Sequence, residues 1–231
     1  MPLRRVGHKG ADRIAPGNTL ASFDAALACG VDMIEFDVLP ERDGDRLILA
    51  HDYRAAARGE PPTLDEGLAH FASDAYGGVE LDVDLKLPGY EDRVVEALRS
   101  FGLVERSLVS SQYRESLARI RAMEPALRLG WSVPRARRDY TGSALTLLPA
   151  HVALAVYRLV LPSRAAAALR AGALDAVMAH WRLVTPRLVR TVRAAGGDLY
   201  VWTVDDVHAI RSLEELGVTG VITNDPRLFE S

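Results

Sequence analysis

The chain has 231 residues, of which 48% are hydrophobic and 26% are charged, and its formal net charge is −3. This composition is that of an ordinary globular protein, and the small negative charge argues against a nucleic-acid surface built on bulk positive charge. The single cysteine, Cys29, excludes an internal disulfide. Because the sequence has neither a signal-peptide core nor an unbroken apolar stretch of about 18 residues, we expect a cytoplasmic protein without stable membrane insertion.

Short apolar runs alternate with amphipathic segments along the whole chain. The expected strands are Arg4–His8, Asp32–Val38, Val79–Lys86, Ser107–Ser111, Arg128–Val133, Ala173–His180, Leu199–Val204 and Gly217–Thr223. The expected helices are Thr19–Ala28, Leu64–Phe71, Glu91–Phe101, Arg114–Met123, Ala144–Arg170, Pro186–Ala195 and Val207–Leu216. Parallel neighbours need crossover helices, so this alternation predicts an α/β fold, a (β/α)8 TIM barrel, as a single domain over residues 1–231.

A small β-hairpin is expected after the second strand. The segment "ERDGD" contains Asp43-Gly44, which is a turn signal, and Arg46–His51 follows it as a short apolar run. We expect this run to fold back along the second strand. His51 would then lie close to Glu35 and Asp37.

Two carboxylates, Glu35 and Asp37, stand two residues apart in the second expected strand, so their side chains share one face. In the third, "VELDVDLK", alternation puts Asp84 nearest the mouth of a barrel, where active sites of this fold lie. One interpretation is a solvated or arginine-paired acidic face. The other is a divalent ion between the carboxylates, with Mg2+ or Ca2+ favoured over zinc because thiolates are absent.

Three further groups converge on the same place. His8 ends the first strand, His51 ends the hairpin, and Lys86 ends the third strand. An imidazole titrates near neutral pH and can act as general acid or base, while an ammonium group attracts an anion. This combination of a metal, a cation and an acid/base pair suits phosphodiester cleavage.

Several motifs together resemble those of one known family. They are "GHKGADRIAPGNTLASFDAALACGVDMIEFDV", "DGDRLILAHD", "DVDLK", "LYVWTVDD" and "GVTGVITNDP". In this order, and over nearly the whole chain, they resemble the glycerophosphodiester phosphodiesterases, a (β/α)8-barrel family. The resemblance implies metal-dependent hydrolysis of a small-molecule glycerophosphodiester to sn-glycerol 3-phosphate and an alcohol.

The resemblance also implies roles for individual residues. His8 and His51 would be the general acid and base, with water or the substrate's own glycerol hydroxyl as nucleophile. One divalent ion, Mg2+, Ca2+ or Mn2+, would bind to Glu35, Asp37 and Asp84. The substrate and its phosphate would contact Lys9, Lys86, Trp202 and His180.

The chain departs from the family pattern at several positions. Lys9 stands in place of an arginine, Gly17 in place of a glutamate, and Asp84 in place of a glutamate, and the segment after His51 is short. These changes leave two alternatives open, a lysophospholipase D-like enzyme with an apolar channel from Ala144–Leu161, and a non-catalytic barrel that binds phosphodiesters. The oligomeric state and the substrate head group do not follow from the sequence.

Overall fold

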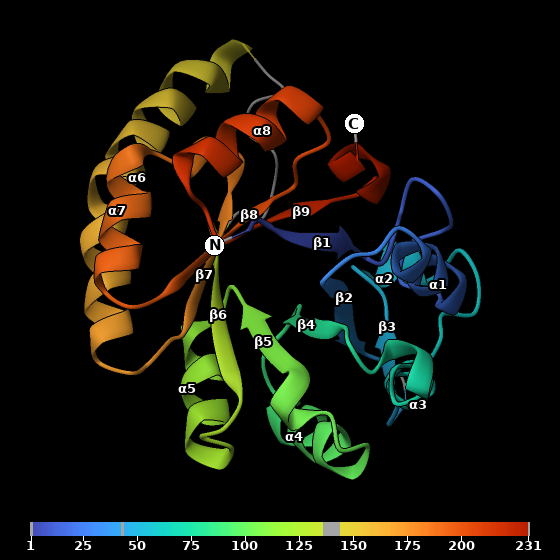
Figure 1. Cartoon of the computed structure of the whole chain (residues 1–231). Helices are drawn as coiled ribbons and strands as arrows, with labels where there is room; N and C mark the ends of the chain where they lie inside the picture. Colours follow the sequence, from blue (N-terminus) through green and yellow to red (C-terminus); the bar gives the residue numbers. More distant parts are fainter. Residues whose placement is uncertain (1, 43, 136–143, 231) are drawn as a thin grey trace.

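Eight parallel strands close into a barrel in the computed structural model, which describes residues 2–42, 44–135 and 144–230, with only the backbone for 144–153. Each strand pairs with its neighbours, and β1 pairs with both β9 and β2, which closes the ring (Figure 1). The barrel strands are β1 (Arg4–His8), β2 (Met33–Pro40), β4 (Glu80–Leu85), β5 (Ser107–Ser111), β6 (Arg128–Val133), β7 (Ala176–His180), β8 (Asp198–Trp202) and β9 (Gly220–Thr223). The predicted TIM barrel is confirmed.

The helices between the strands lie outside the barrel (Figure 1). They are α1 (Leu20–Ala28), α2 (Tyr53–Ala56), α3 (Leu64–Phe71), α4 (Glu91–Ser100), α5 (Arg114–Met123), α6 (Ala144–Arg170), α7 (Pro186–Ala194) and α8 (Val207–Leu216). All seven predicted helices are present, and the short α2 was not predicted. No helix in the described ranges is long and apolar enough to cross a membrane. The cytoplasmic location stays a prediction.

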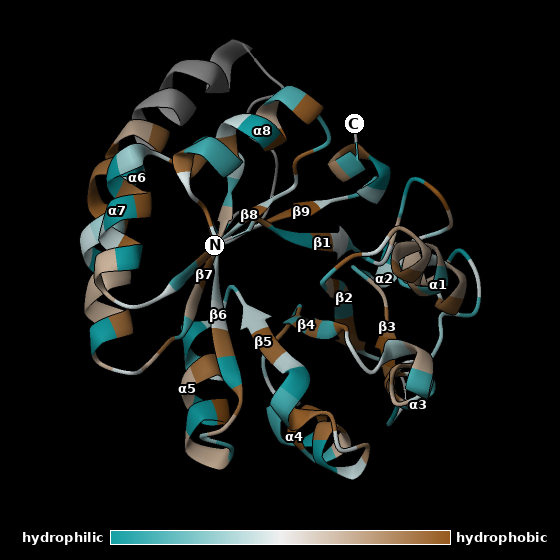
Figure 2. Cartoon of the chain, in the orientation of Figure 1, coloured by the Kyte–Doolittle hydropathy of each residue, from teal (hydrophilic) through white to brown (hydrophobic). Residues whose placement is uncertain are grey.

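Local sequence signals set where the helices begin. The side chains of Thr19 and Thr63 accept hydrogen bonds from the third residue of α1 and α3, and both helices have a complete capping box. Thr185 caps α7 in the same way and is followed by Pro186, whose fixed backbone suits a first helical position. Hydrophobic (brown) and hydrophilic (teal) residues alternate along the surrounding helices, as expected for helices that pack one face against a sheet (Figure 2).

The predicted hairpin is present but shorter than expected. β3 (Leu47–Leu49) pairs antiparallel with β2, in the register Val38↔Leu49 and Pro40↔Leu47. Asp43 of the predicted turn lies outside the described residues. His51 therefore follows the hairpin strand instead of ending it, on a loop that leads into α2.

The barrel interior is filled below the mouth. Its middle layer is a buried apolar cluster of Val6, Met33, Leu108, Ala176, Met178, Tyr200 and Ile222. Below it, at the N-terminal ends of the strands, Glu80 pairs with Arg4 at 2.6 Å and with Arg128 at 2.7 Å. The polar residues above the apolar layer consequently open only toward the C-terminal ends of the strands.

Candidate active site

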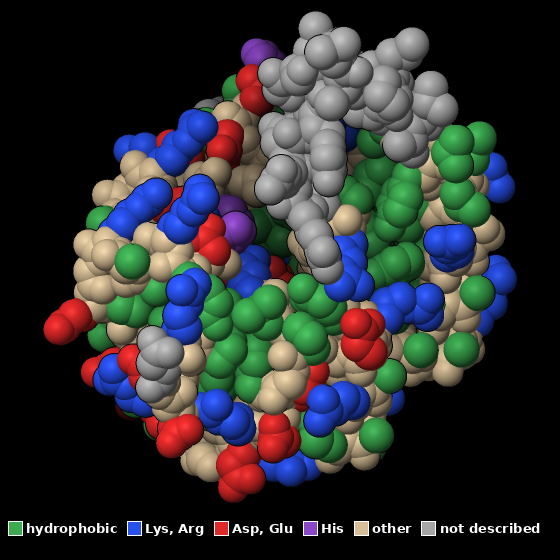
Figure 3. All heavy atoms as spheres, turned by 180° about the vertical axis from the view of Figure 1, so that it is seen from behind, with side chains coloured by type: hydrophobic (Ala, Val, Ile, Leu, Met, Phe, Trp, Pro, Cys, Tyr) green, Lys and Arg blue, Asp and Glu red, His purple; other side chains and the backbone are tan. Residues whose placement is uncertain are grey.

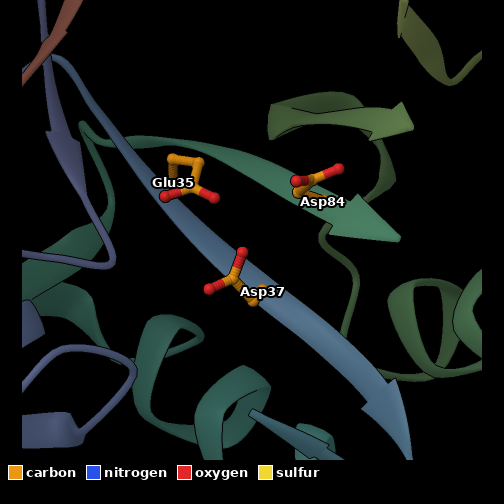
Figure 4. Close-up of side chains that lie close together, drawn as sticks. All are labelled: Glu35, Asp37 and Asp84. Atoms are coloured by element: carbon orange, nitrogen blue, oxygen red, sulfur yellow. The ribbon is translucent and has the colours of Figure 1, made fainter. Parts of the chain in front are cut away.

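Three carboxylates gather at the C-terminal ends of β2 and β4. In the parallel register Asp37 lies beside Asp84, and Glu35 lies two pairs earlier, beside Asp82. One carboxylate oxygen from each of Glu35, Asp37 and Asp84 lies within 4.8 Å of the others. Figure 4 shows Glu35 and Asp37 on one strand and Asp84 on its neighbour. The strand alternation that predicted this cluster holds.

Lys86 lies directly against two of these carboxylates. Its Nζ is 2.5 Å from Asp37 Oδ1 and 2.5 Å from Asp84 Oδ2. Burial alone would lower the pKa of Lys86, but the charges of Asp37 and Asp84 outweigh it and raise the pKa well above its usual value. Burial would likewise raise the pKa of Asp37, but Lys86 outweighs it and the pKa falls. Lys86 and Asp37 are thus both charged at neutral pH.

The ion pair does not neutralise the cluster. Burial and then the neighbouring Asp37 raise the pKa of Glu35 well above its usual value, which is the response of a carboxyl group that lacks a compensating charge. Asp84 Oδ1 is buried and has no hydrogen-bond partner in the described structure. Once Glu35 is ionised as well, the three carboxylates and Lys86 together carry a formal charge of −2. A divalent cation with oxygen ligands fits both the orphaned oxygen and this charge.

Two backbone turns hold the acidic side chains in place. Asn18 Nδ2 donates to Asp37 Oδ2 at 2.8 Å, and Asn18 Oδ1 accepts from the Asp37 backbone N–H at 3.0 Å. The backbone N–H of Lys9 donates to Glu35 Oε2 at 2.8 Å. Lys9 and Asn18 both have positive φ, 51° and 59°, so the turns are shaped for these contacts. Asn18 lies in the "PGNT" part of the first quoted motif, but no sequence pattern indicates its partner.

His8 is held by a chain of hydrogen bonds from the end of β9. Its Nδ1 is 2.5 Å from Asn224 Oδ1, and its Nε2 is 3.8 Å from Glu35 Oε2. Asn224 Nδ2 donates to Asp205 Oδ2 at 2.7 Å, which turns the amide oxygen toward the imidazole. An amide oxygen only accepts, so Nδ1 carries the proton and Nε2 is free to accept one. Burial, with Lys9 nearby, lowers the pKa of His8 to about 4.

A pocket of about 160 Å³ opens over this group, and its lining includes His8, Glu35, His51, Asp84 and Lys86. Figure 3 shows the hollow from the mouth side, where histidine, basic and acidic side chains meet. The His51 side chain is 53% exposed, and its Nδ1 lies 3.3 Å from Asp52 Oδ2. The two predicted histidines therefore differ, since His8 is enclosed and His51 stands at the open edge of the pocket.

Comparison with known proteins agrees with this arrangement. The sequence profile described as the Glycerophosphoryl diester phosphodiesterase family matches residues 8–66 and 62–228. The chain belongs to this family. It is a phosphodiesterase that hydrolyses glycerophosphodiesters, as its motifs predicted.

Individual relatives match the phosphodiesterase over most of their length. A glycerophosphodiester phosphodiesterase of Caldanaerobacter subterraneus subsp. tengcongensis is 26% identical, covering 96% of this chain and 93% of that protein. One of Bacillus subtilis (strain 168) is 24% identical, covering 97% and 84%.

Solved structures share the barrel. A glycerophosphodiester phosphodiesterase from Agrobacterium tumefaciens str. C58 superposes with a TM-score of 0.72 at 20% identity, over 99% of this chain and 100% of the other. An Oleispira antarctica phosphodiesterase, solved in complex with the product sn-glycerol-3-phosphate, superposes with a TM-score of 0.70 at 21% identity, over 100% and 98%.

The remaining predicted substrate contacts of the phosphodiesterase are spread around the mouth. Trp202 lines the pocket, and its indole N–H donates to the Met178 carbonyl at 2.8 Å. His180 lies behind it, edge-on to the indole at 5.1 Å between ring centroids. Lys9 Nζ lies 3.4 Å from Asp12 Oδ2, at the rim, and Lys9 is not among the pocket-lining residues. The roles of these three residues stay predictions.

Proposed function

We propose that the mouth pocket hydrolyses small glycerophosphodiesters with His8 as general base and His51 as general acid, while Glu35, Asp37 and Asp84 hold one Mg2+ or Ca2+ ion. The observation that carries the proposal is that one pocket is lined by an enclosed imidazole, a lysine and the carboxylates of Glu35 and Asp84, with Asp37 grouped beside them. A relative of the same fold binds sn-glycerol-3-phosphate, the product expected here.

His8 is suited to accept a proton. Its lowered pKa of about 4 keeps the ring neutral at physiological pH, and the bond to Asn224 leaves Nε2 as the basic atom. It would take the proton of the attacking oxygen, either of water or of the substrate's glycerol hydroxyl. His51, at the open edge, would give a proton to the departing alcohol oxygen as the phosphorus–oxygen bond breaks.

Lys86, together with a divalent ion bound by the carboxylates, would stabilise the negative charge of the diester. Lys86 lines the pocket with its Nζ beside Asp37 and Asp84, so an ammonium group faces the place where phosphate oxygens would lie. When bound, a divalent ion on the three carboxylates supplies charge that polarises a phosphoryl oxygen. Hydrogen bonds from Asn18 to Asp37 and from the Lys9 backbone N–H to Glu35 hold these carboxylates in position before the substrate binds.

The size of the pocket favours a deacylated substrate. Its volume of about 160 Å³ equals that of about five water molecules in the liquid. Among the described residues, this volume encloses no space for an acyl chain beside the glycerol phosphate group. Of the proposed apolar channel, Ala144–Leu161, the side chains of residues 144–153 lie outside the described structure.

The test is release of glycerol 3-phosphate from glycerophosphocholine and glycerophosphoethanolamine. Purified protein is treated with EDTA and then supplied with Mg2+, Ca2+ or Mn2+, beside the His8→Ala and His51→Ala variants. We expect metal-restored turnover that falls at least 100-fold in each variant. Turnover of detergent-dispersed lysophosphatidylcholine but of neither water-soluble diester would establish the lysophospholipase alternative. Binding without turnover, unaffected by His51→Ala, would establish the non-catalytic barrel.

A further inference from the structure

Helix α6 carries most of the large hydrophobic side chains that are exposed in the described part of the chain. Val156, Leu159 and Val160 of this helix are 55%, 65% and 37% exposed. Their i, i+3, i+4 spacing puts all three on one face of the helix. Trp181 is 48% exposed, and Ile14 is the only other large hydrophobic residue exposed within the described ranges. Exposed apolar side chains that gather in one region mark an interaction surface.

Trp181 connects this helix face with the mouth of the barrel. It begins the 3-10 helix η4 (Trp181–Leu183), which directly follows the C-terminal end of β7. Arg158 of α6 donates from its Nε to the Arg182 carbonyl at 2.7 Å, so η4 packs beside this turn of α6. The Trp181 ring stacks on His180 at 5.6 Å between ring centroids, and His180 in turn contacts the indole that lines the pocket. The apolar face of α6 therefore lies next to the mouth.

The same part of the chain is strongly basic. Between residues 144 and 197 the sequence has seven arginines and one acidic residue, Asp175, although the whole chain has a net charge of −3. Asp175 precedes β7 at the opposite end of the barrel and pairs with Arg121. None of the seven arginines pairs with a carboxylate among the described residues, and Arg164 and Arg190 are exposed. Hydrophobic (green) and basic (blue) side chains accordingly lie side by side at the right of Figure 3.

This combination of side chains matches the surface of an anionic phospholipid bilayer. Unpaired arginines attract the charged headgroups, and a tryptophan ring is suited to the level of the headgroups. The aliphatic side chains of one helix face can enter the boundary between headgroups and acyl chains. A second copy of this chain fits the face less well, because a symmetric contact would bring the unpaired arginines of both copies together.

We propose that Val156, Leu159, Val160 and Trp181, with the arginines around them, dock the protein on an anionic phospholipid surface. The docking is peripheral and reversible, because only a few apolar side chains enter the bilayer. In the docked protein the mouth opens beside the lipid headgroups. A consequence for the reaction rests on the proposed function, since glycerophosphodiesters are formed when both acyl esters of a membrane phospholipid are hydrolysed. The docked pocket would then receive them close to where they are released.

Co-sedimentation with lipid vesicles tests this surface. The full chain in EDTA is mixed with vesicles of phosphatidylcholine alone or of phosphatidylcholine with phosphatidylserine, at low and at high salt. We expect the wild type to bind the anionic vesicles at least about tenfold more tightly than the neutral ones, and high salt to remove most of this difference. Leu159→Gln should bind the anionic vesicles at least about fivefold more weakly, because it removes the most exposed apolar side chain of the face.

The matched control is Ile14→Gln, which changes an exposed aliphatic residue on the loop between β1 and α1 and should bind as the wild type does. Equal binding to both kinds of vesicle, or equal binding by Leu159→Gln and Ile14→Gln, would overturn the docking surface. Binding that appears only when Mg2+ is added would assign the lipid to the acidic cluster and overturn it as well.

Sedimentation velocity without lipid tests the other occupant of the face. A wild-type dimer that Leu159→Gln converts to a monomer would assign the face to a second copy of this chain and overturn the proposal, whereas a monomeric wild type that binds anionic vesicles would support it. Neither experiment depends on turnover, so the glycerol 3-phosphate assay tests the proposed function separately.

Discussion

His8 and Asn224 are joined by a hydrogen bond of 2.5 Å between ring and amide, although they are separated by nearly the whole chain. The orientation of the amide comes from Asp205, which accepts from the Asn224 backbone N–H at 2.9 Å and from its Nδ2 at 2.7 Å. The Thr223 hydroxyl donates to the same carboxylate at 3.0 Å. The closing strand of the barrel thereby fixes which nitrogen of His8 is free to accept a proton.

Replacing Asn224 by alanine should slow turnover without removing the substrate contacts. His8 would lose the acceptor that holds its Nδ1 proton, and its ring could take the wrong tautomer or rotamer. We expect kcat to fall about 10- to 100-fold, the range seen when a supporting hydrogen bond to a site histidine is lost, with KM changed less than threefold. Steady-state kinetics on glycerophosphoethanolamine measure both constants.

The control for this change is Arg13→Ala. Arg13 lies 3.3 Å from the same Asp205 carboxylate, but its side chain is 56% exposed and lies outside the His8 chain. Its loss should leave kcat within twofold. If Asn224→Ala were as active as Arg13→Ala, the positioning role of the amide would be wrong.

Divalent ions should stabilise the fold through the acidic cluster. A ligand that binds only the folded state at 100 times its Kd adds about 2.7 kcal/mol to the free energy of unfolding. For a chain of this length that corresponds to a rise in Tm of roughly 5–10 °C. Thermal unfolding with EDTA and then with Mg2+, Ca2+ or Mn2+ measures the shift and ranks the ions.

Asp84→Asn should abolish most of this metal-dependent shift, because it removes one of the three anionic ligands. Asp12→Asn is the matched control, since Asp12 is an acidic residue of the rim that pairs with Lys9 and accepts from the Gly17 N–H. It should retain the full shift. The same shift in both variants would place the bound ion elsewhere.

The fold and the acidic cluster follow from short-range patterns in the sequence. A strand can be predicted from a short apolar run, and a helix from the spacing of its apolar residues. Glu35 and Asp37 stand two residues apart in a strand, so both side chains point into the barrel. The same parity directs Asp82 and Asp84 to one face, and Asp84 was chosen because it lies nearer the end of its strand. The register agrees with this choice, because Asp84 lies beside Asp37 and Asp82 lies beside Glu35.

The supporting residues could not be found in this way. The partner of Asn18 depends on a tight turn with positive φ, and the partner of His8 depends on how the last strand closes the barrel onto the first. No local pattern encodes such pairings. The place of Lys9 in the motif predicted a phosphate contact, which stays a prediction. The structure adds a second role that the motif did not indicate, because the backbone N–H of Lys9 donates to Glu35 while its ammonium group lies beside Asp12.

The N-terminal end of β4 should matter for stability and not for catalysis. Glu80 pairs with Arg4 and Arg128 below the apolar layer, whereas Asp84 on the same strand reaches the pocket above it. Glu80→Gln removes the carboxylate that Arg4 and Arg128 share, while Arg128 keeps its pair with Asp198. Because the Glu80 side chain is 28% exposed, we expect a loss of about 1–2 kcal/mol in the free energy of unfolding. Urea unfolding should show this loss, while kcat and KM stay within twofold of wild type. A tenfold fall in kcat would contradict the view that the N-terminal end of β4 serves stability and not catalysis.

The burial of neutral His8 should make the metal-free protein less stable as the pH falls. The pKa of His8 is about 4 in the folded protein, against an ordinary value of 6.5, so between these two pH values the unfolded chain binds a proton that the folded one does not. The free energy of unfolding therefore falls as pH is lowered through this window, by at most about 1.4 kcal/mol per pH unit from this group. Urea unfolding in EDTA at pH 7, 6 and 5 measures the slope, and His8→Asn, which cannot titrate, should show a shallower one. All other titrating groups are common to both proteins, so parallel slopes would mean that His8 takes up its proton equally well in the folded state.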